Sequence, residues 1–434
     1  MPAGHNISKL PDFNAAATEF EAVWALVSKA VPPASPPEQR RATLDPMWQQ
    51  LITSSAVLPL AVEPAWSGAC ADECAGVRII DGTCVCSAAI TPRSSAAITP
   101  SAAVSGGAPL PLAERLTSAL QPILDERAKR YDSGFTLAFV NANTTVELVS
   151  GSTRRTNDAK RSPVPMMETS DSLFWGSITK MYTAAAVMRL VESGHVGLDD
   201  PAHAHIDPVL AAANGSSMAK LFGPSASNVS VRHLLSMRSG LFDFDDDATR
   251  SFQNTHPHLD LSPIDDVRFA SIDGRRQPLY PAGTHQDYSS TNYELLGLLL
   301  MRYTNTSRWD VLDQRAAVFG STAELLQRFP QTRFAIHGPC SNHTRVHGYQ
   351  PDDRYGMGLD TAYISCTNGF TCGNMYAPSR EVADFVYALY AEAGIISRKA
   401  VNEMTHIWEW CTTTRDTNPP PPAAYAVCHG VLPV

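Results

Sequence analysis

Residues 87–112 divide this chain of 434 residues into two unequal parts. The stretch contains Ser-Ala-Ala-Ile-Thr-Pro twice, at 87–92 and at 95–100. Sequence this rich in small residues and proline cannot bury enough apolar surface to build a core. We therefore interpret it as a linker between an N-terminal extension, residues 1–86, and a main domain, residues 113–434.

Nine cysteines form three groups along the chain. The groups are Cys70, Cys74, Cys84 and Cys86; then Cys340, Cys366 and Cys372; then Cys411 and Cys428. The odd count leaves at least one thiol unpaired. The first group could be read as a zinc site, but its Cys-x3-Cys and Cys-x-Cys spacing lacks the paired CxxC that is usual there. We favour disulfides over zinc, and with them an oxidising compartment.

Asparagine sequons support a secreted glycoprotein. Asn-x-Ser/Thr occurs at Asn6, Asn143, Asn214, Asn228, Asn305 and Asn342, whereas about two or three would be expected by chance. No segment reaches the roughly 18 apolar residues of a membrane span. The first 30 residues do not resemble a signal peptide. Met47, which precedes the apolar stretch Leu51–Val62, is a candidate for the true start, and the alternative is a buried helix in the extension.

Charge and histidine patterns exclude two classes of function. The formal net charge is −9 and no run of five Lys or Arg occurs, so nucleic-acid binding is not expected. The pairs His203/His205 and His256/His258 lack an accompanying ligand cluster, so we expect no metal site. The acidic residues at 243 and 245–247 lack the glycine and distal glutamate of a calcium loop. We interpret them as a solvated loop.

The main domain begins with helical and strand patterns and continues mostly as helices. Leu116, Leu120, Ile123 and Leu124 recur at helical spacing, with Pro122 as a possible kink. Gly134–Val140 and Thr145–Ser150 predict an antiparallel hairpin. Further helices are predicted at Ser177–Ser193, Asn292–Tyr303, Trp309–Phe319 and Ser379–Ala393. The pattern indicates an α+β fold, with an antiparallel sheet flanked by helices and a largely helical middle region.

A serine and a lysine three residues apart are the sharpest chemical signal. In Phe-Trp-Gly-Ser-Ile-Thr-Lys-Met, residues 174–181, Ser177 and Lys180 project from the same face of a helix. Serine is a weak nucleophile until a base takes its proton, and lysine is such a base only if desolvation or positive charge depresses its pKa. A serine in the first helical turn also lies where N–H groups stabilise an oxyanion.

Ser-x-x-Lys alone is a weak motif, and it recurs at Ser217–Lys220. The ordinary interpretation is an N-cap serine beside a solvated lysine, and we apply it to Ser217. Ser177, in contrast, is followed by Met-Arg-Leu-Val-Glu-Ser-Gly-His-Val-Gly-Leu-Asp-Asp-Pro at 188–201. This context resembles the active-site helix of the β-lactamase and penicillin-binding-protein superfamily, in particular class C β-lactamases, DD-peptidases and related esterases.

Three later segments, 229–241, 281–297 and 372–385, resemble the same family in the same order. The resemblance spans roughly residues 113–410 and implies a β-lactamase/transpeptidase-like fold. It makes Tyr288 the tyrosine of the family's Tyr-x-Asn motif, which helps to move the serine proton. The alternative is an ordinary half-buried aromatic residue. Thr291 and Glu294 form a Thr-x-x-Glu pattern, which predicts a capping box and puts Tyr288 in a turn ahead of a helix.

Two features depart from the family pattern. Ser290 stands where the motif has asparagine, and we interpret it as a weakened substitute in substrate binding. The family also has closing strands with Lys-Thr-Gly or His-x-Gly, but here only His429-Gly430-Val431 comes near that motif, and we treat it as a chance match. The closing strands are therefore expected to be incomplete, leaving the hairpin with exposed edges.

The resemblance implies a serine hydrolase without a cofactor. Ser177 would attack an amide or ester carbonyl, Lys180 and Tyr288 would relay its proton, and water would hydrolyse the acyl-enzyme. β-Lactams, D-amino-acid peptides and small esters all remain possible substrates, and Ser290 favours an esterase or peptidase over an antibiotic-defence enzyme. The alternative is a non-catalytic secreted binding protein, or a defective product, on the same scaffold.

Overall fold

The computed structural model describes residues 77–80, 83–86, 110–156, 163–272, 275–350, 359–367 and 369–405. The chain divides into two units, residues 1–108 and 109–434. In the first unit, β1 (Val77–Ile80) and β2 (Thr83–Cys86) pair antiparallel. The following predicted features lie outside the described residues: Met47, Asn6, Cys70, Cys74, Cys411, Cys428 and the motif at 429–431.

The second unit begins with a helix packed on a hairpin. Helix α3 (Leu112–Tyr131) runs through Pro122 without a break, and β3 (Phe135–Val140) pairs antiparallel with β4 (Thr145–Ser150) as predicted. The apolar faces of the three elements pack together around Leu124, Val146 and Leu148. Because this burial removes apolar surface from water, it holds the helix on the sheet.

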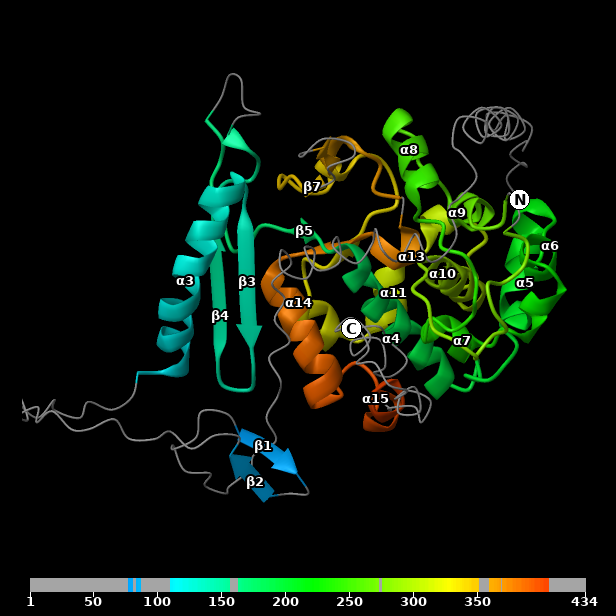
Figure 1. Cartoon of the computed structure of the whole chain (residues 1–434), viewed down its shortest axis with the longest axis horizontal. Coiled ribbons are helices and arrows are strands. Elements are labelled where there is room, and N and C mark those ends of the chain that lie inside the picture. Colours follow the sequence, from blue (N-terminus) through cyan, green and yellow to red (C-terminus); the bar gives the residue numbers. More distant parts are fainter. Residues whose placement is uncertain are drawn as a thin grey trace, which may run out of the picture. The chain divides into compact units, whose positions relative to one another are not determined.

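The hairpin lies between α3 and α14 (Ser379–Val386), as Figure 1 shows. The hydroxyls of Thr136 on β3 and Ser379 on α14 are 2.7 Å apart and share a hydrogen bond. Within the described residues this sheet has two strands, β3 and β4. A second sheet of three short strands has the order β5 (Leu173–Phe174), β9 (Met375–Ala377), β6 (Arg333–Phe334).

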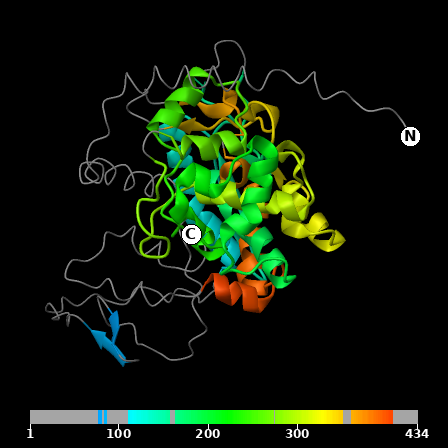
Figure 2. The same ribbon diagram turned by 90° about the vertical axis from the view of Figure 1, so that its right-hand side faces the viewer.

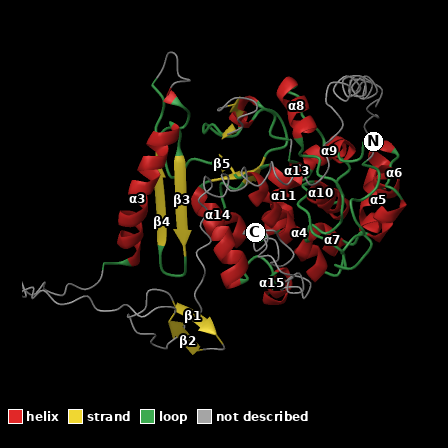
Figure 3. Cartoon of the chain, viewed as in Figure 1, coloured by secondary structure: helices red, strands yellow, loops and turns green. Residues whose placement is uncertain are grey.

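Helices make up most of the second unit, as the colouring in Figure 3 shows. They are α4 (Thr179–Glu192), α5 (Ala202–Asn214), α6 (Met218–Phe222), α7 (Val231–Leu235), α8 (Asp247–Thr255), α9 (Pro263–Phe269), α10 (Thr291–Tyr303), α11 (Gln314–Phe319), α12 (Ala323–Arg328), α13 (Phe370–Gly373) and α15 (Arg398–Met404). Two further short strands, β7 (Tyr349–Gln350) and β8 (Leu359–Asp360), pair antiparallel. None of the described helices is long and apolar enough to cross a membrane.

Helix α10 is the centre of the helical part. Every residue from Thr291 to Met301 is buried, and α4, α5, α7, α9 and α13 all contact the helix. Gly297 allows the closest of these approaches, because a Cβ at that position would collide with the side chain of Thr371 on α13. Figure 2 shows this helical part from the side, with segments of different colours, and so of different places in the sequence, in one body.

The predicted helices are found with two differences. The segment Trp309–Phe319 is not one helix: a 3₁₀ turn covers Trp309–Val311, and α11 begins at Gln314 after Asp313 caps its N-terminus. The segment after Ser379 begins as an α-helix and ends in one π-helical stretch, Tyr387–Glu392. The fold class is confirmed as β-lactamase/transpeptidase-like, mostly helical with small antiparallel sheets.

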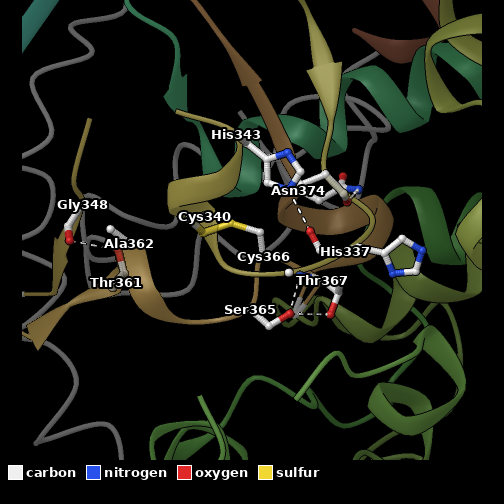
Figure 4. Close-up of a disulfide and its surroundings, with 12 residues drawn as sticks. His337, Cys340, His343, Gly348, Thr361, Ala362, Ser365, Cys366, Thr367 and Asn374 are labelled. Atoms are coloured by element: carbon white, nitrogen blue, oxygen red, sulfur yellow. Dashed lines mark hydrogen bonds between the residues drawn. A yellow bond between two sulfur atoms is a disulfide. The ribbon is translucent and has the colours of Figure 1, made fainter. Parts of the chain in front are cut away.

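A disulfide joins Cys340 to Cys366, and their Cα atoms are 5.1 Å apart (Figure 4). The two segments that the disulfide joins also exchange backbone hydrogen bonds. Cys340 donates its N–H to the Ile364 carbonyl at 3.1 Å, and Cys366 donates its N–H to the Gly338 carbonyl at 2.9 Å. Cys372, the third cysteine of this group, is buried and unpaired. The disulfide therefore closes the surface loop that precedes α13.

Replacing both Cys340 and Cys366 by serine will lower the thermal stability. Closing a loop with a sequence separation of 26 residues stabilises a protein by about 3 kcal/mol, chiefly by restricting the unfolded chain. We expect the melting temperature under non-reducing conditions to fall by roughly 5–10 °C, measured by calorimetry. Reductant should lower the melting temperature of the native chain but not that of the double variant. An unchanged melting temperature in the double variant would contradict this account.

Candidate active site

Ser177 sits at the junction between β5 and α4. The preceding residue Trp175 is held twice by β9, through its N–H to the Met375 carbonyl at 3.0 Å and its indole N–H to the Ala377 carbonyl at 2.8 Å. Gly176 has a φ of 52°, in the left-handed region that favours glycine. Ser177 lies in the 3₁₀ turn Gly176–Ile178 and is exposed at the N-terminus of α4. N–H groups and the helix dipole favour negative charge there.

The three residues predicted to carry catalysis meet at this point. The hydroxyl oxygens of Ser177 and Tyr288 are 2.6 Å apart. Lys180 donates a hydrogen bond from Nζ to Ser177 Oγ at 3.1 Å, and the same Nζ lies 5.0 Å from the centre of the Tyr288 ring. The phenol therefore has a specific polar contact in addition to its apolar ones, although 36% of the residue remains exposed.

Lys180 is buried, and its charge is stabilised by its neighbours. A second Nζ hydrogen bond reaches the carbonyl of Cys372 at 3.0 Å. Burial alone would lower the pKa of Lys180, but attraction to Cys372, Tyr288 and Asp243 outweighs it, and the pKa lies above its ordinary value. The condition under which lysine would act as the base, a depressed pKa, is therefore not met. At neutral pH Lys180 is an ammonium that stabilises negative charge on neighbouring oxygens.

Helix α13 is fixed in place behind Lys180 by two threonines. Thr183 on α4 donates to the Thr371 carbonyl at 2.6 Å, and Thr371 donates to the Tyr293 carbonyl at 2.6 Å. Thr183, Thr371 and the Tyr293 side chain are all buried. These bonds tie α4, α13 and α10 together and so hold the carbonyl that receives the lysine.

The segment carrying Tyr288 is joined to the loop before α8. Ser290 donates its N–H to Asp243 Oδ1 at 3.0 Å, and Thr291 donates its hydroxyl to the Phe242 carbonyl at 2.8 Å. The predicted capping box is wrong, because the Thr291 hydroxyl is committed to this loop and Glu294 points into the interior. Ser290 is buried at the start of α10, two residues after Tyr288 in the chain.

Asp243 is a site residue that sequence reasoning missed. The interpretation of a solvated acidic loop fails at this position, because the carboxylate accepts the N–H groups of Ser290 and of Asp245, the latter at 3.1 Å. Burial and the like charge of Asp245 raise the pKa of Asp243 to about 6. Attraction to Lys180 opposes this shift. Asp243 is therefore an anion facing Lys180 at neutral pH, and only its place just after the 229–241 segment could have pointed to it.

The second Ser-x-x-Lys has an entirely different geometry. Ser217 caps the N-terminus of α6, where its hydroxyl accepts the N–H of Lys220 at 3.2 Å. The Lys220 ammonium is exposed and binds the Gly215 carbonyl at 2.8 Å. Serine and lysine share no proton here, so this repeat is the N-cap that the sequence predicted. Among the described residues, no group of three His, Cys, Asp or Glu side chains could hold a metal ion.

The arrangement around Ser177 supports nucleophilic chemistry. An exposed hydroxyl at a helix N-terminus touches a phenol that can take its proton, and a buried ammonium stabilises the resulting negative charge. Such an arrangement can activate a serine for nucleophilic attack.

Comparison with known sequences identifies the family of the chain. The profile of the Beta-lactamase family matches residues 128–430, so the chain belongs to the beta-lactamase family.

One solved structure shares the fold at a TM-score of 0.50, and two others are similar at lower scores. D-amino acid amidase from Ochrobactrum anthropi SV3, complexed with L-phenylalanine amide, has a TM-score of 0.50 and 23% identity, covering 68% of this chain and 74% of that one. D-stereospecific amidohydrolase from Streptomyces sp. has a TM-score of 0.49 and 22% identity over 67% of this chain and 77% of that one. A penicillin binding protein from Bacillus halodurans has a TM-score of 0.45 and 17% identity over 65% and 78%.

Gly176→Ala will lower both stability and the reactivity of Ser177. A Cβ meets no neighbouring atom at Gly176, so the cost is the left-handed backbone, about 1–2 kcal/mol. Gly194, at the other end of α4, has a φ of 73° and the same open space, and is a matched control. The free energy of unfolding, measured in urea, should fall by a similar amount in both variants. Only Gly176→Ala should slow labelling of Ser177 by a fluorophosphonate, and equal labelling rates would argue against a positioning role.

Proposed function

We propose that this protein is a serine hydrolase that cleaves an amide or ester bond through an acyl-enzyme on Ser177. The observation that carries the proposal is the convergence on Ser177 Oγ of two groups from distant segments, Tyr288 Oη at 2.6 Å and Lys180 Nζ at 3.1 Å. Ser217, which has the same sequence spacing, lacks both contacts. The family membership and the shared fold support this chemistry.

In the proposed reaction, Ser177 Oγ forms a bond to the substrate carbonyl carbon as its proton moves to Tyr288 Oη. The form that reacts is the one in which the tyrosine oxygen has already lost its proton, and the Lys180 ammonium stabilises the negative charge there. The proton then passes from Tyr288 to the leaving amine or alcohol as the bond to the carbonyl carbon breaks. Water attacks the acyl-enzyme by the same route and releases the acid.

The substrate class extends from amides to small esters. Ser290 replaces the amide side chain of the Tyr-x-Asn motif, which favours a substrate that needs no hydrogen bond from a side-chain amide at this position. Phenylalanine amides and simple aryl esters are the first compounds to test, because the amidase of the same fold was solved with L-phenylalanine amide. β-Lactams and D-amino-acid peptides complete the panel.

Covalent labelling tests the proposal directly. A fluorophosphonate should add one mass increment to the native chain, and Ser177→Ala should abolish the addition. Ser217→Ala, the matched control in the second Ser-x-x-Lys, should label like the native chain. Tyr288→Phe and Lys180→Ala should each slow labelling by about 10²-fold or more, since the first removes the group that takes the serine proton and the second removes the charge that stabilises it. A folded native chain that takes up neither a fluorophosphonate nor a fluorescent penicillin would instead support a non-catalytic binding protein.

We further propose that the chain is secreted and carries N-linked glycans. All five sequon asparagines in the described residues are exposed: Asn143, Asn214, Asn228, Asn305 and Asn342. Asn143 lies in the tight turn between β3 and β4, where the Asn141 side chain caps the backbone at 2.9 Å. The disulfide between Cys340 and Cys366 agrees with an oxidising compartment.

The chain expressed through a eukaryotic secretory pathway should be heterogeneous in mass, and removal of its glycans by peptide-N-glycosidase should leave a single mass. Mass spectrometry after release in heavy-oxygen water should find labelled aspartate at several of these asparagines. The Asn143→Gln variant should lose one glycan without a change in melting temperature, because its side chain is exposed in a turn. A secreted chain with none of the five asparagines modified would contradict the proposal.

A further inference from the structure

Two carboxylic acids are buried in the helical core without hydrogen-bond partners. Glu294 on α10 and Asp266 on α9 are both 0% exposed. None of their four carboxyl oxygens has a hydrogen-bond partner among the described residues. Burying a charged carboxylate without partners costs far more than burying the neutral acid. Both groups are therefore expected to carry a proton in the folded chain at neutral pH.

Of the two acids, Glu294 is the one that interacts with the lysine of the candidate site. The ring of Tyr293, the neighbour of Glu294 on α10, is centred 5.9 Å from Lys180 Nζ. Cys372 supplies the carbonyl that Lys180 binds, and its thiol lies beside the Glu294 carboxyl, close enough to lower the pKa of that carboxyl. The groups that face Glu294 are thus Lys180 from α4, Cys372 from α13, Asp266 from α9 and Asp243 from the loop before α8.

The other two helices that pack on α10 bring their ionisable groups to different places. On α7, Arg232 pairs with Asp199 and Glu403, and His233 bonds with Ser230. On α5, His205 shares a hydrogen bond with Tyr303 at the far end of α10. Among the described residues, Lys180 is therefore the cation that acts on Glu294.

We propose that Glu294 is a positioning residue of the Ser177 site, an uncharged acid behind Lys180 that leaves Asp243 as the single counter-carboxylate of the lysine. The proposal rests on the hydrolase function proposed above. Its reason is electrostatic. A second carboxylate behind Lys180 would disfavour negative charge on Tyr288 and on Ser177, the two oxygens that become anionic in the reaction.

Ionisation of Glu294 should therefore switch the site off as the pH rises. Burial raises the pKa of Glu294 to about 8, with Cys372 and Lys180 opposing the shift. Burial and the nearness of Glu294 also raise the pKa of Asp266 well above its ordinary value. Between about pH 6, where Asp243 ionises, and about pH 8 Glu294 is neutral and the site has one counter-carboxylate. Above this range, a second negative charge appears behind the lysine.

The test compares Glu294→Gln with the native chain by two independent measurements. The first is the melting temperature between pH 4 and 8.5, which needs no activity. The pKa of Glu294 is 4.5 in the unfolded chain and about 8 in the folded chain. The stability that the neutral acid contributes is therefore fully present below pH 4.5 and is lost as the pH rises through about 8. Glutamine keeps the shape and cannot ionise. The variant should match the native melting temperature near pH 4 and exceed it by about 5 °C or more at pH 8.

Glu381→Gln is the matched control for burial of a glutamate. Its carboxylate accepts hydrogen bonds from the N–H groups of Gln331 and Thr332 and from the Thr332 hydroxyl. Removing that charge should lower the melting temperature at pH 7. If Glu294→Gln behaved like this control, with a lower melting temperature at pH 8, Glu294 would be ionised and the proposal would be wrong whatever the activity.

The second measurement is the rate of Ser177 labelling against pH. The native rate should fall above about pH 8, and in Glu294→Gln this fall should move up by at least one pH unit while the rate at pH 6.5 stays within about threefold. An unchanged alkaline fall would show that Glu294 is merely neutral and has no positioning role. If the native chain labels at no pH, the hydrolase function fails and the positioning role fails with it, while the melting temperatures still report the charge of Glu294.

Discussion

The burial of the Lys180 ammonium is the constraint around which the helical part of this protein is arranged. A buried cation needs hydrogen bonds and a counter-charge, and they come from separate segments. α13 provides the Cys372 carbonyl, the turn before α4 provides Ser177, and the loop before α8 provides the carboxylate of Asp243. The requirement to satisfy one ammonium therefore brings together residues almost 200 positions apart, and the nucleophile is one of its partners.

The local parts of this arrangement could be predicted from the sequence, because they depend on spacing along one element. Ser177 and Lys180 share a face of one helix, and the hairpin of β3 and β4 follows from two β-rich runs around a polar turn. Spacing alone could not separate Ser177 from Ser217, which has the same motif and serves as an N-cap. The difference lies in what packs on the lysine, and tertiary contacts decide it. The longer context, read as a resemblance to a family, was what distinguished the two.

Asp243 and Glu294 could not be predicted, because their roles depend on burial by other segments. Four acidic residues at 243 and 245–247 look like a solvated loop, yet the first of them is turned inward by the N–H of Ser290. Thr291 and Glu294 have the spacing of a capping box, but α10 is covered on all sides from Thr291 to Met301. A first-turn glutamate on such a helix has no solvent to reach, so the same spacing produces a buried acid.

The raised pKa of Lys180 also bears on which bonds the site could cleave. An ester leaves as an alcohol of modest basicity, whereas an amide leaves as an amine that must receive a proton as the bond breaks. In the proposed reaction the proton that Tyr288 takes from Ser177 is the one that the amine receives, and Lys180 stays protonated beside the tyrosine throughout. Asp243 and Glu294 both interact with this ammonium, and burial leaves only Asp243 ionised at neutral pH. This charge balance suits both halves of the proposed reaction, an anionic oxygen to activate the serine and an available proton for the leaving group.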